Sequence, residues 1–265
     1  MVTENTLRVL KLLGREDIEV YEGCSKAMKR TMKFKKLVHG ERGLAGQLMS
    51  MDTKEKNSIH GVDFILDEVN KAPGQITLIM LAPLTNLAMA IAKDPTIVDK
   101  VKEVYIMGGV FNEPGNITPL AEFNFFADPK AAYEVLKSGI KPKIVGLDTT
   151  TKARLYEEEL NKINKETKLG DFVRNITGFF IDKSSTNRNN RSCSLHDPLV
   201  VSTVIDESII EFRADFVDIE YSSRLCDGQS VSYFNRSGYS PNAKVAIAHN
   251  DEKFKKIFLD SIIED

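Results

Sequence analysis

Two hydrophobic patterns alternate along the middle of this chain. Continuous apolar runs of strand length occur within residues 75–81, 101–109 and 141–150. Between them lie 84–95 and 128–139, where apolar residues recur every three or four positions, as they do in amphipathic helices. Buried-type strands that alternate with such helices are typical of βαβ units. We therefore expect an α/β, Rossmann-like domain with a mostly parallel central sheet and helices on both faces.

The flanking regions have different patterns. The chain opens on a predicted helix over 2–13, with Thr3 as its N-cap, and "IEVYEG" is typical of a short strand. After Thr151 we expect a helical cap inserted over approximately 152–196, with long polar helices near 155–166 and 170–185. A helix from about Asp197, three strand-like segments and a terminal helix complete a single domain over 1–265; the strand-like segments are 211–221, 229–235 and 243–249.

Composition narrows the class of protein. The chain has 265 residues, 42% of them hydrophobic, and a formal net charge of −2. Because no basic field is present, we expect neither nucleic acid nor a membrane surface as a partner. The three cysteines are odd in number and far apart, which favours reduced thiols and a cytoplasmic location over a disulfide framework.

The segment after the second predicted strand, 107–129, mixes amide and carboxylate side chains with phenylalanines. In parallel sheets, ligands bind just beyond the carboxyl ends of the strands. Asn116, Glu122 and Asn124 could satisfy the hydroxyls of a polyhydroxylated ligand, with the aromatic rings excluding water. The same residues are also typical of an irregular loop with asparagine turns over a phenylalanine core. Asp128, before Pro129, is predicted to be only a helix cap.

Three further positions carry candidate chemistry. In "SLHDPLVV", Asp197 can cap a helix, or it can join His196 in holding a metal or protonating a leaving group. His39 lies in a glycine-rich turn and is either a surface residue or part of a site. The carbonyl of Leu81, at the end of the first apolar run, could bind a hard cation.

Five motifs together resemble the inosine–uridine-preferring nucleoside hydrolases, which are nucleoside N-ribohydrolases. The block G-N-x-T-P-x-x-E-F-N-x-x-x-D-P is specific, and H-D-P follows it downstream. The motifs occur in the family's order and run through nearly the whole chain; they are "HGERGLAG", "LAPLTNLAMAI", "VYIMGG", "GNITPLAEFNFFADPKAA" and "LHDPLVV".

This resemblance implies hydrolysis of the N-glycosidic bond of ribonucleosides, giving ribose and a free nucleobase. Asn116, Glu122 and Asn124 match ribose-binding positions, and Asp197 matches a calcium ligand that also contacts substrate. The Leu81 carbonyl matches the backbone ligand of the calcium ion.

The resemblance also assigns the base side of the site. His196 matches a catalytic residue beside the leaving base, and His39 matches a base-pocket histidine. Purine or pyrimidine preference stays open, and a homodimer or homotetramer is implied.

The sequence also departs from the family pattern. Family members begin with a strand that ends in a D-x-D-x-x-x-D-D cluster, which supplies most calcium-binding carboxylates and the general base. Met1 aligns just after that first βαβ unit, so we expect little calcium affinity and impaired activity in this chain. The alternative function is a catalytically dead ribose- or nucleoside-binding protein.

Overall fold

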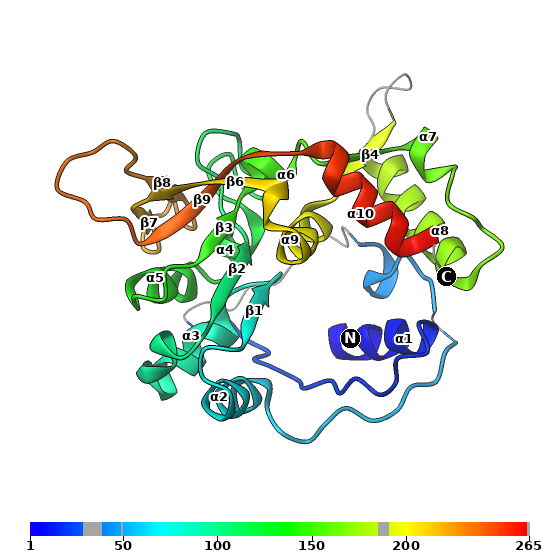
Figure 1. Cartoon of the computed structure of the whole chain (residues 1–265), viewed down its shortest axis with the longest axis horizontal. Helices are drawn as coiled ribbons and strands as arrows, with labels where there is room; N and C mark the ends of the chain where they lie inside the picture. The colour runs from blue at the N-terminus through cyan, green and yellow to red at the C-terminus, as the bar shows by residue number, and fades with distance from the viewer. Residues whose placement is uncertain (29–38, 49, 185–190, 264–265) are drawn as a thin grey trace.

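The computed structural model describes residues 1–28, 39–48, 50–184 and 191–263. Its centre is a five-stranded sheet in the order β1-β2-β3-β9-β6 (Figure 1). The first four strands in that order are parallel, and β6 runs antiparallel to β9. The mostly parallel sheet is therefore confirmed. The strands span Thr77–Met80 (β1), Glu103–Met107 (β2), Lys143–Val145 (β3), Ala243–His249 (β9) and Ile210–Asp215 (β6).

Side chains of β2 alternate between two hydrophobic cores, one on each face of the sheet. Val104 and Ile106 point into one core, while Tyr105 and Met107 point into the other. This is the two-residue period of a strand that is buried on both sides. The position of a residue in the strand therefore determines which of the two helix layers its side chain packs against.

Helices cover both faces, as the sequence predicts. α3 and α5 contribute Leu87, Ala131 and Val135 to the first core. α9 and α10 contribute Leu199 and Phe254 to the second. The bounds are Gly61–Lys71 (α2), Thr85–Lys93 (α3), Phe123–Ala127 (α4), Pro129–Lys137 (α5), Leu147–Thr150 (α6), His196–Ile205 (α9) and Asp251–Ile263 (α10).

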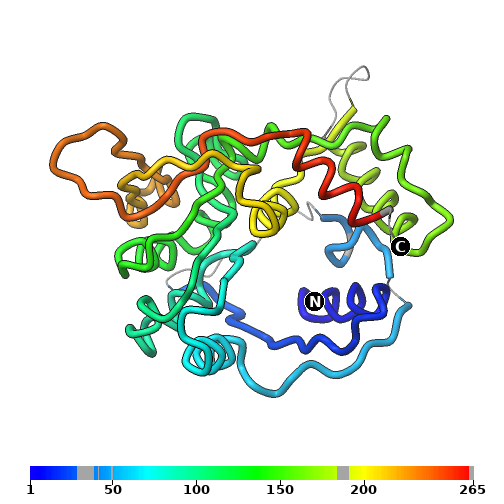
Figure 2. Tube along the Cα trace, viewed as in Figure 1, coloured from blue at the N-terminus to red at the C-terminus, as the bar shows by residue number. Residues whose placement is uncertain are grey.

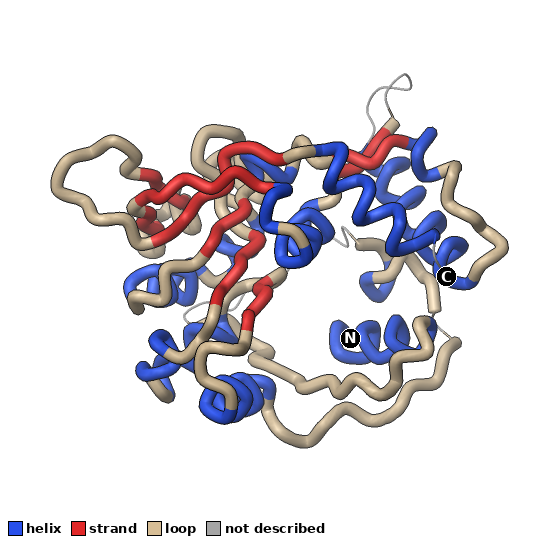
Figure 3. Tube along the Cα trace, in the orientation of Figure 1, coloured by secondary structure: helices blue, strands red, loops and turns tan. Residues whose placement is uncertain are grey.

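The amino-terminal segment lies to one side of the sheet (Figure 2). Residues 13–28 and 50–60 are mostly loop (Figure 3). Its helix, α1, spans Val2–Leu12 with Met1 at the N-cap, so the predicted cap at Thr3 is wrong. The expected strand "IEVYEG" is also wrong, because this stretch forms a single β-bridge, from Tyr21 to Asn57. A lone bridge offers too few hydrogen bonds to define a strand.

Residues 152–184 and 191–196, the described part of the expected cap, contain one long helix, not two. α8 spans Lys168–Ser184, close to the prediction. The expected helix near 155–166 is wrong, because β4 and the four-residue α7 occupy its start, and β4 pairs antiparallel with β5. The bounds are Arg154–Tyr156 (β4), Glu157–Leu160 (α7) and Ser192–Ser194 (β5).

A second hairpin and three 3-10 turns complete the fold. The antiparallel hairpin joins Val217–Ile219 (β7) to Ser230–Ser232 (β8). The 3-10 turns are Glu41–Gly43 (η1), Pro95–Asp99 (η2) and Glu207–Ile209 (η3). Among the described residues, no helix is both long and apolar enough to cross a bilayer.

Candidate functional site

Most predicted site residues gather at the carboxyl ends of β1, β2 and β3. Leu81 follows β1 directly and packs against the same core as Met107, the last residue of β2. The helix α9 packs against β2 and begins with His196 and Asp197. The parallel register of the three strands is what brings these distant segments to one edge.

Glu122 is buried, at 2% exposure, and its carboxylate is held by backbone donors. One oxygen accepts from the Asn124 N–H at 2.8 Å, and the other from Gly109 at 3.0 Å and Phe125 at 3.2 Å. Burial raises the pKa of Glu122 to about 7 against the opposing effect of these donors, and the charge of Asp197 raises it further. The side chain therefore caps α4 and also lies within electrostatic reach of Asp197.

The two asparagines of the same segment have different environments. Asn124 is buried, and its amide group donates to the Met107 carbonyl at 3.0 Å. Asn116 is exposed, and its side-chain oxygen accepts from the Phe123 N–H at 2.9 Å. Both therefore stabilise the loop, while each amide group retains further hydrogen-bonding capacity. The interpretation as a ligand-binding loop and the interpretation as an irregular structural loop are therefore compatible.

Asp128 does more than cap α5. One carboxylate oxygen accepts from the Ala131 N–H at 3.2 Å, which is the predicted cap. The other accepts from the Thr85 hydroxyl at 2.6 Å and from the Met28 N–H at 2.9 Å. The prediction that Asp128 is only a cap is wrong, because it joins α3, α5 and the amino-terminal segment.

His196 is bound by a residue that sequence reasoning did not single out. Its Nδ1 lies 2.7 Å from the Oγ1 of Thr150, the last residue of α6. Burial, with a smaller contribution from the positive charge of Arg154, lowers the pKa of His196 to about 4. The ring is therefore neutral near pH 7, and it acts on a ligand as a hydrogen-bond donor or acceptor rather than as a cation.

Asp197 is in the first turn of α9 but does not cap it. The N-cap position belongs to Leu195, and no side-chain hydrogen bond is recorded there among the described residues. The capping interpretation of Asp197 is therefore wrong. Its side chain keeps solvent-exposed surface, yet nearby protein atoms desolvate the carboxylate and raise its pKa to about 6. A carboxylate without a cap function is available to a ligand.

His39 lies in a different environment, against the long helix α8. Its ring meets the edge of Phe180 with ring centroids 5.3 Å apart. Desolvation lowers the pKa of His39. We expect base preference to depend on the region around 170–192, of which residues 185–190 lie outside the described residues.

Calcium does not fit the donors that the structure describes. Calcium takes six to eight oxygen ligands, several of them carboxylates. No cluster of three or more Asp, Glu, His or Cys side chains suited to a metal occurs within residues 1–28, 39–48, 50–184 and 191–263. Asp197 and the Leu81 carbonyl, the two predicted ligands, fall short of that set.

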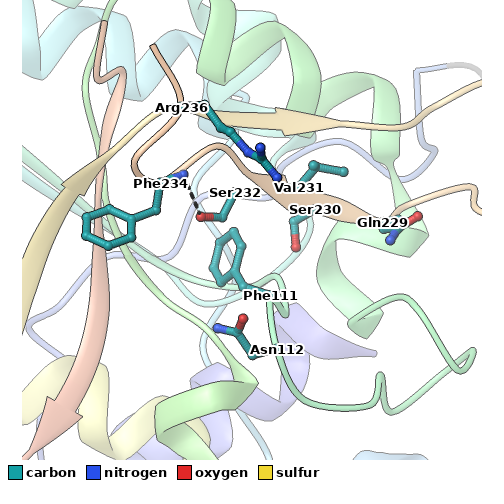
Figure 4. Close-up of a pocket in the computed structure, with 8 residues that line it drawn as sticks. All are labelled: Phe111, Asn112, Gln229, Ser230, Val231, Ser232, Phe234 and Arg236. Atoms are coloured by element: carbon teal, nitrogen blue, oxygen red, sulfur yellow. Dashed lines mark hydrogen bonds between the residues drawn. The ribbon is translucent and has the colours of Figure 1, made fainter. Parts of the chain in front are cut away.

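Two cavities border the loop after β2, near the predicted residues but not lined by them. One, of about 350 Å³, lies between Phe111–Asn112 and the hairpin residues Ser230 and Ser232. Figure 4 shows the Phe111 side chain between Asn112 and the two serines. The other, of about 250 Å³, lies over β9 and includes Asp148.

Three residues have clear roles in the structure that the sequence did not assign to them individually. Asp148 accepts from the backbone N–H groups of Phe111 and Asn112, at 2.8 and 2.7 Å, and so anchors the loop after β2. Thr150 binds His196, and Arg154 influences its charge. The sequence does contain a signal for Asp148 and Thr150, because both directly follow the end of a buried strand in "KIVGLDTT".

The chain matches known proteins over nearly its full length. The model of the inosine-uridine preferring nucleoside hydrolase family covers residues 1–256. A nucleoside hydrolase of that preference from Crithidia fasciculata is 34% identical over 265 residues, covering 98% of this chain and 84% of that protein. A pyrimidine-specific ribonucleoside hydrolase from Shewanella oneidensis is 32% identical, covering 97% of this chain and 82% of that protein.

Solved structures agree with this assignment. A plant nucleoside hydrolase superposes with a TM-score of 0.89 at 27% identity, covering 99% of this chain and 86% of that one. A purine-preferring ribonucleoside hydrolase from Gardnerella vaginalis has a TM-score of 0.89 at 26% identity, covering 98% of this chain and 84% of that one. The sequence motifs, the sheet and these matches agree, and the chain belongs to the inosine–uridine preferring nucleoside hydrolase family.

Proposed function

We propose that this chain acts on ribonucleosides by hydrolysing the N-glycosidic bond to give ribose and a free nucleobase. The observation that carries the proposal is the family match over residues 1–256, together with the gathering of Leu81, Glu122, Asn124, His196 and Asp197 at one edge of the sheet. Nucleoside substrates are the common chemistry of the named relatives.

The ribose is assigned to the loop after β2. Asn116 and Asn124 offer amide groups, and Glu122 offers a carboxylate held in place by three backbone donors. A sugar hydroxyl is both donor and acceptor, so amides and a carboxylate can bind several hydroxyls at once. Because the backbone fixes Glu122 before the ligand arrives, binding costs little ordering of that side chain.

Departure of the base leaves positive charge on the sugar ring. Fixed carboxylate charge stabilises such an oxocarbenium-like transition state. The raised pKa values of Glu122, about 7, and Asp197, about 6, mean that both carboxylates are ionised only above neutral pH. His196 is assigned to the base, where its neutral imidazole donates or accepts a hydrogen bond. His39 is assigned to the outer base pocket.

A second candidate function is nucleoside binding without turnover. The metal donors favour it, because the described residues do not form the set that calcium takes. Without an activated water, the site would still hold a ribose through Asn116, Glu122 and Asn124.

Ribose release from uridine and inosine separates the two functions. The purified 265-residue chain is incubated with each nucleoside, with and without calcium, and reducing sugar is measured over time. Turnover that Asp197→Ala abolishes supports the hydrolase. Saturable nucleoside binding by calorimetry with no ribose release supports the binding protein, and the absence of both binding and turnover overturns both proposals.

A further inference from the structure

We propose that Thr150 is a positioning residue that holds His196 in one orientation and in the tautomer with its proton on Nε2. The contact that carries this inference is the 2.7 Å separation between Thr150 Oγ1 and His196 Nδ1. It joins the end of α6 to the start of α9, residues that are 46 positions apart in the sequence. The assignment of the ring to a nucleobase rests on the proposed function; the tautomer does not.

Hydrogen-bond satisfaction selects the tautomer. Thr150 is fully buried, at 0% exposure, and His196 is the partner that the described structure gives its hydroxyl. If Nδ1 carried the proton and donated it, the hydroxyl hydrogen of Thr150 would be left buried without an acceptor. A buried donor without a partner is destabilising, because the group has lost its hydrogen bonds to water without replacement. The favoured arrangement has the Thr150 hydroxyl donating to Nδ1, so that Nε2 carries the proton.

The neighbouring threonines show that this arrangement is specific to Thr150. Thr151 donates its hydroxyl to the Leu147 carbonyl one turn earlier, at 2.7 Å, as helical threonines commonly do. Thr149 donates to the Ala246 carbonyl of β9 at 3.1 Å. Of the three consecutive hydroxyls, the one at Thr150 is directed at an imidazole.

Hydrogen bonds between the segment after Thr150 and the segment before His196 hold the two residues together. The Leu195 N–H donates to the Ala153 carbonyl at 2.8 Å, and Ser194 Oγ donates to the Thr151 carbonyl at 3.2 Å. Arg154 donates to Ser192 Oγ at 2.9 Å and to the Ser192 carbonyl at 3.1 Å. The segment carrying Thr150 therefore cannot move relative to His196 without breaking several hydrogen bonds.

The tautomer determines which nitrogen of His196 can bind a ligand and whether it donates or accepts. With Nδ1 occupied by Thr150, Nε2 is the nitrogen left to meet a ligand, and it does so as an N–H donor. The acceptors that this donor fits are the ring nitrogens and carbonyl oxygens of a nucleobase. The orientation is fixed before the ligand binds.

Nitrogen NMR of the histidine rings tests the tautomer directly. The chain has four histidines, so ¹⁵N-histidine labelling and a His196→Gln variant assign the signal. At slightly alkaline pH, long-range ¹H–¹⁵N spectra distinguish a protonated Nε2 from a protonated Nδ1. We expect His196 with its proton on Nε2 in the native chain and in Thr150→Ser, and a mixture of tautomers in Thr150→Val, which keeps the side-chain shape.

Thr149→Val is the matched control, because it removes an equally buried hydroxyl from the adjacent position. It should leave the His196 signal in the native tautomer, and circular dichroism should show that each variant is folded. A proton on Nδ1 in the native chain, or a native tautomer in folded Thr150→Val, would overturn the proposal. If Thr150→Val does not fold, the native and Thr150→Ser spectra still decide the tautomer.

Kinetics extend the test to the proposed function. Where the chain releases ribose, Thr150→Val should lower kcat at least tenfold while Thr150→Ser retains it. Loss in both variants, or in neither, would contradict a positioning role. A chain that releases no ribose at all contradicts the hydrolase, whereas the NMR result on Thr150 stands independently.

Discussion

The central sheet and the amino-terminal segment of this protein are stabilised in different ways. Ile106, Ile144 and Val145 have no exposed surface, and the cores on the two faces of the sheet are continuous. In α1, by contrast, Leu7 is the buried residue, while Val2 and the C-cap residue Leu13 are exposed. The sheet is held by apolar burial, which scales with the area removed from water.

The amino-terminal segment is held mainly by polar contacts. Asn5 donates to the Arg42 carbonyl and Lys11 to the Asp52 carbonyl, both at exposed positions. Nearer the sheet, the Cys24 N–H donates to Asn86 and the Met28 N–H to Asp128. Exposed hydrogen bonds contribute little net stability. Loss of the buried acceptor Asp128, in contrast, would leave its donors unpaired and would lower the free energy of unfolding. The comparison shows that a few buried polar residues attach a loosely packed segment to a rigid core.

The largest effect should come from a cavity in the sheet. Ile144→Ala removes a fully buried side chain of β3 and should lower the free energy of unfolding by about 3 to 4 kcal/mol. Leu7→Ala, the equivalent deletion in α1, should cost about 1 to 2 kcal/mol, because Leu7 belongs to none of the hydrophobic cores formed by the described residues. Urea denaturation of both variants measures the difference. Equal losses would show that the two regions are equally well packed.

Removing the connection between the regions should have the next largest effect. Asp128→Ala leaves the Thr85 hydroxyl and two backbone N–H groups without their acceptor, so we expect a loss of about 3 kcal/mol. Limited proteolysis should then cleave within residues 13–60 faster than in the native chain. Asp94→Ala is the control, since Asp94 caps the exposed turn η2 and should cost far less. A proteolysis rate unchanged in Asp128→Ala would contradict the attachment role.

The buried carboxylate at the candidate site should make stability depend on pH. The folded pKa of Glu122, about 7, lies above the ordinary glutamate value of 4.5, so the folded state binds more protons between these two values. The contribution of Glu122 to stability should therefore be greatest below about pH 4.5 and fall by about 2 to 3 kcal/mol as pH rises to above about 7. Unfolding by urea across this range compares the native chain with Glu122→Gln.

The difference between the Glu122→Gln and native stabilities should change with pH by that amount. Asn116→Ala, in the same loop, removes no titrating group, so its curve should run parallel to that of the native chain. A Glu122→Gln curve that is also parallel would contradict the raised pKa.

The smallest expected effect is that of calcium. Because the described donors do not form a calcium-binding set, millimolar calcium should leave the Tm of the 265-residue chain unchanged and produce no binding heat. Magnesium at the same concentration is the control for ionic strength. Tight calorimetric binding of calcium, with a rise in Tm of several degrees, would contradict this prediction.

The fold was largely predictable because its signals are local. The continuous apolar run at Val104, Tyr105, Ile106 and Met107 is typical of a strand buried on both faces, and Asp128 before Pro129 marks a helix start. The predictions failed where local signals were weak. The stretch near 155–166 is polar enough for an exposed helix. Its first residues nevertheless form part of β4, because they pair with the distant strand β5. Local sequence cannot report such a partner.

The same distinction between local signals and distant partners applies to the candidate site. The sequence by itself determined the family motifs, their order, and the residue types available at the strand ends. Only the tertiary structure decided that Glu122 is fixed by the Gly109 N–H, that Asp197 is not a helix cap, and that Thr150 binds His196. The physical reason is that residue type sets what a side chain can donate or accept. Which partner it meets, and how far burial shifts its pKa, depends on segments that only the folded sheet brings together.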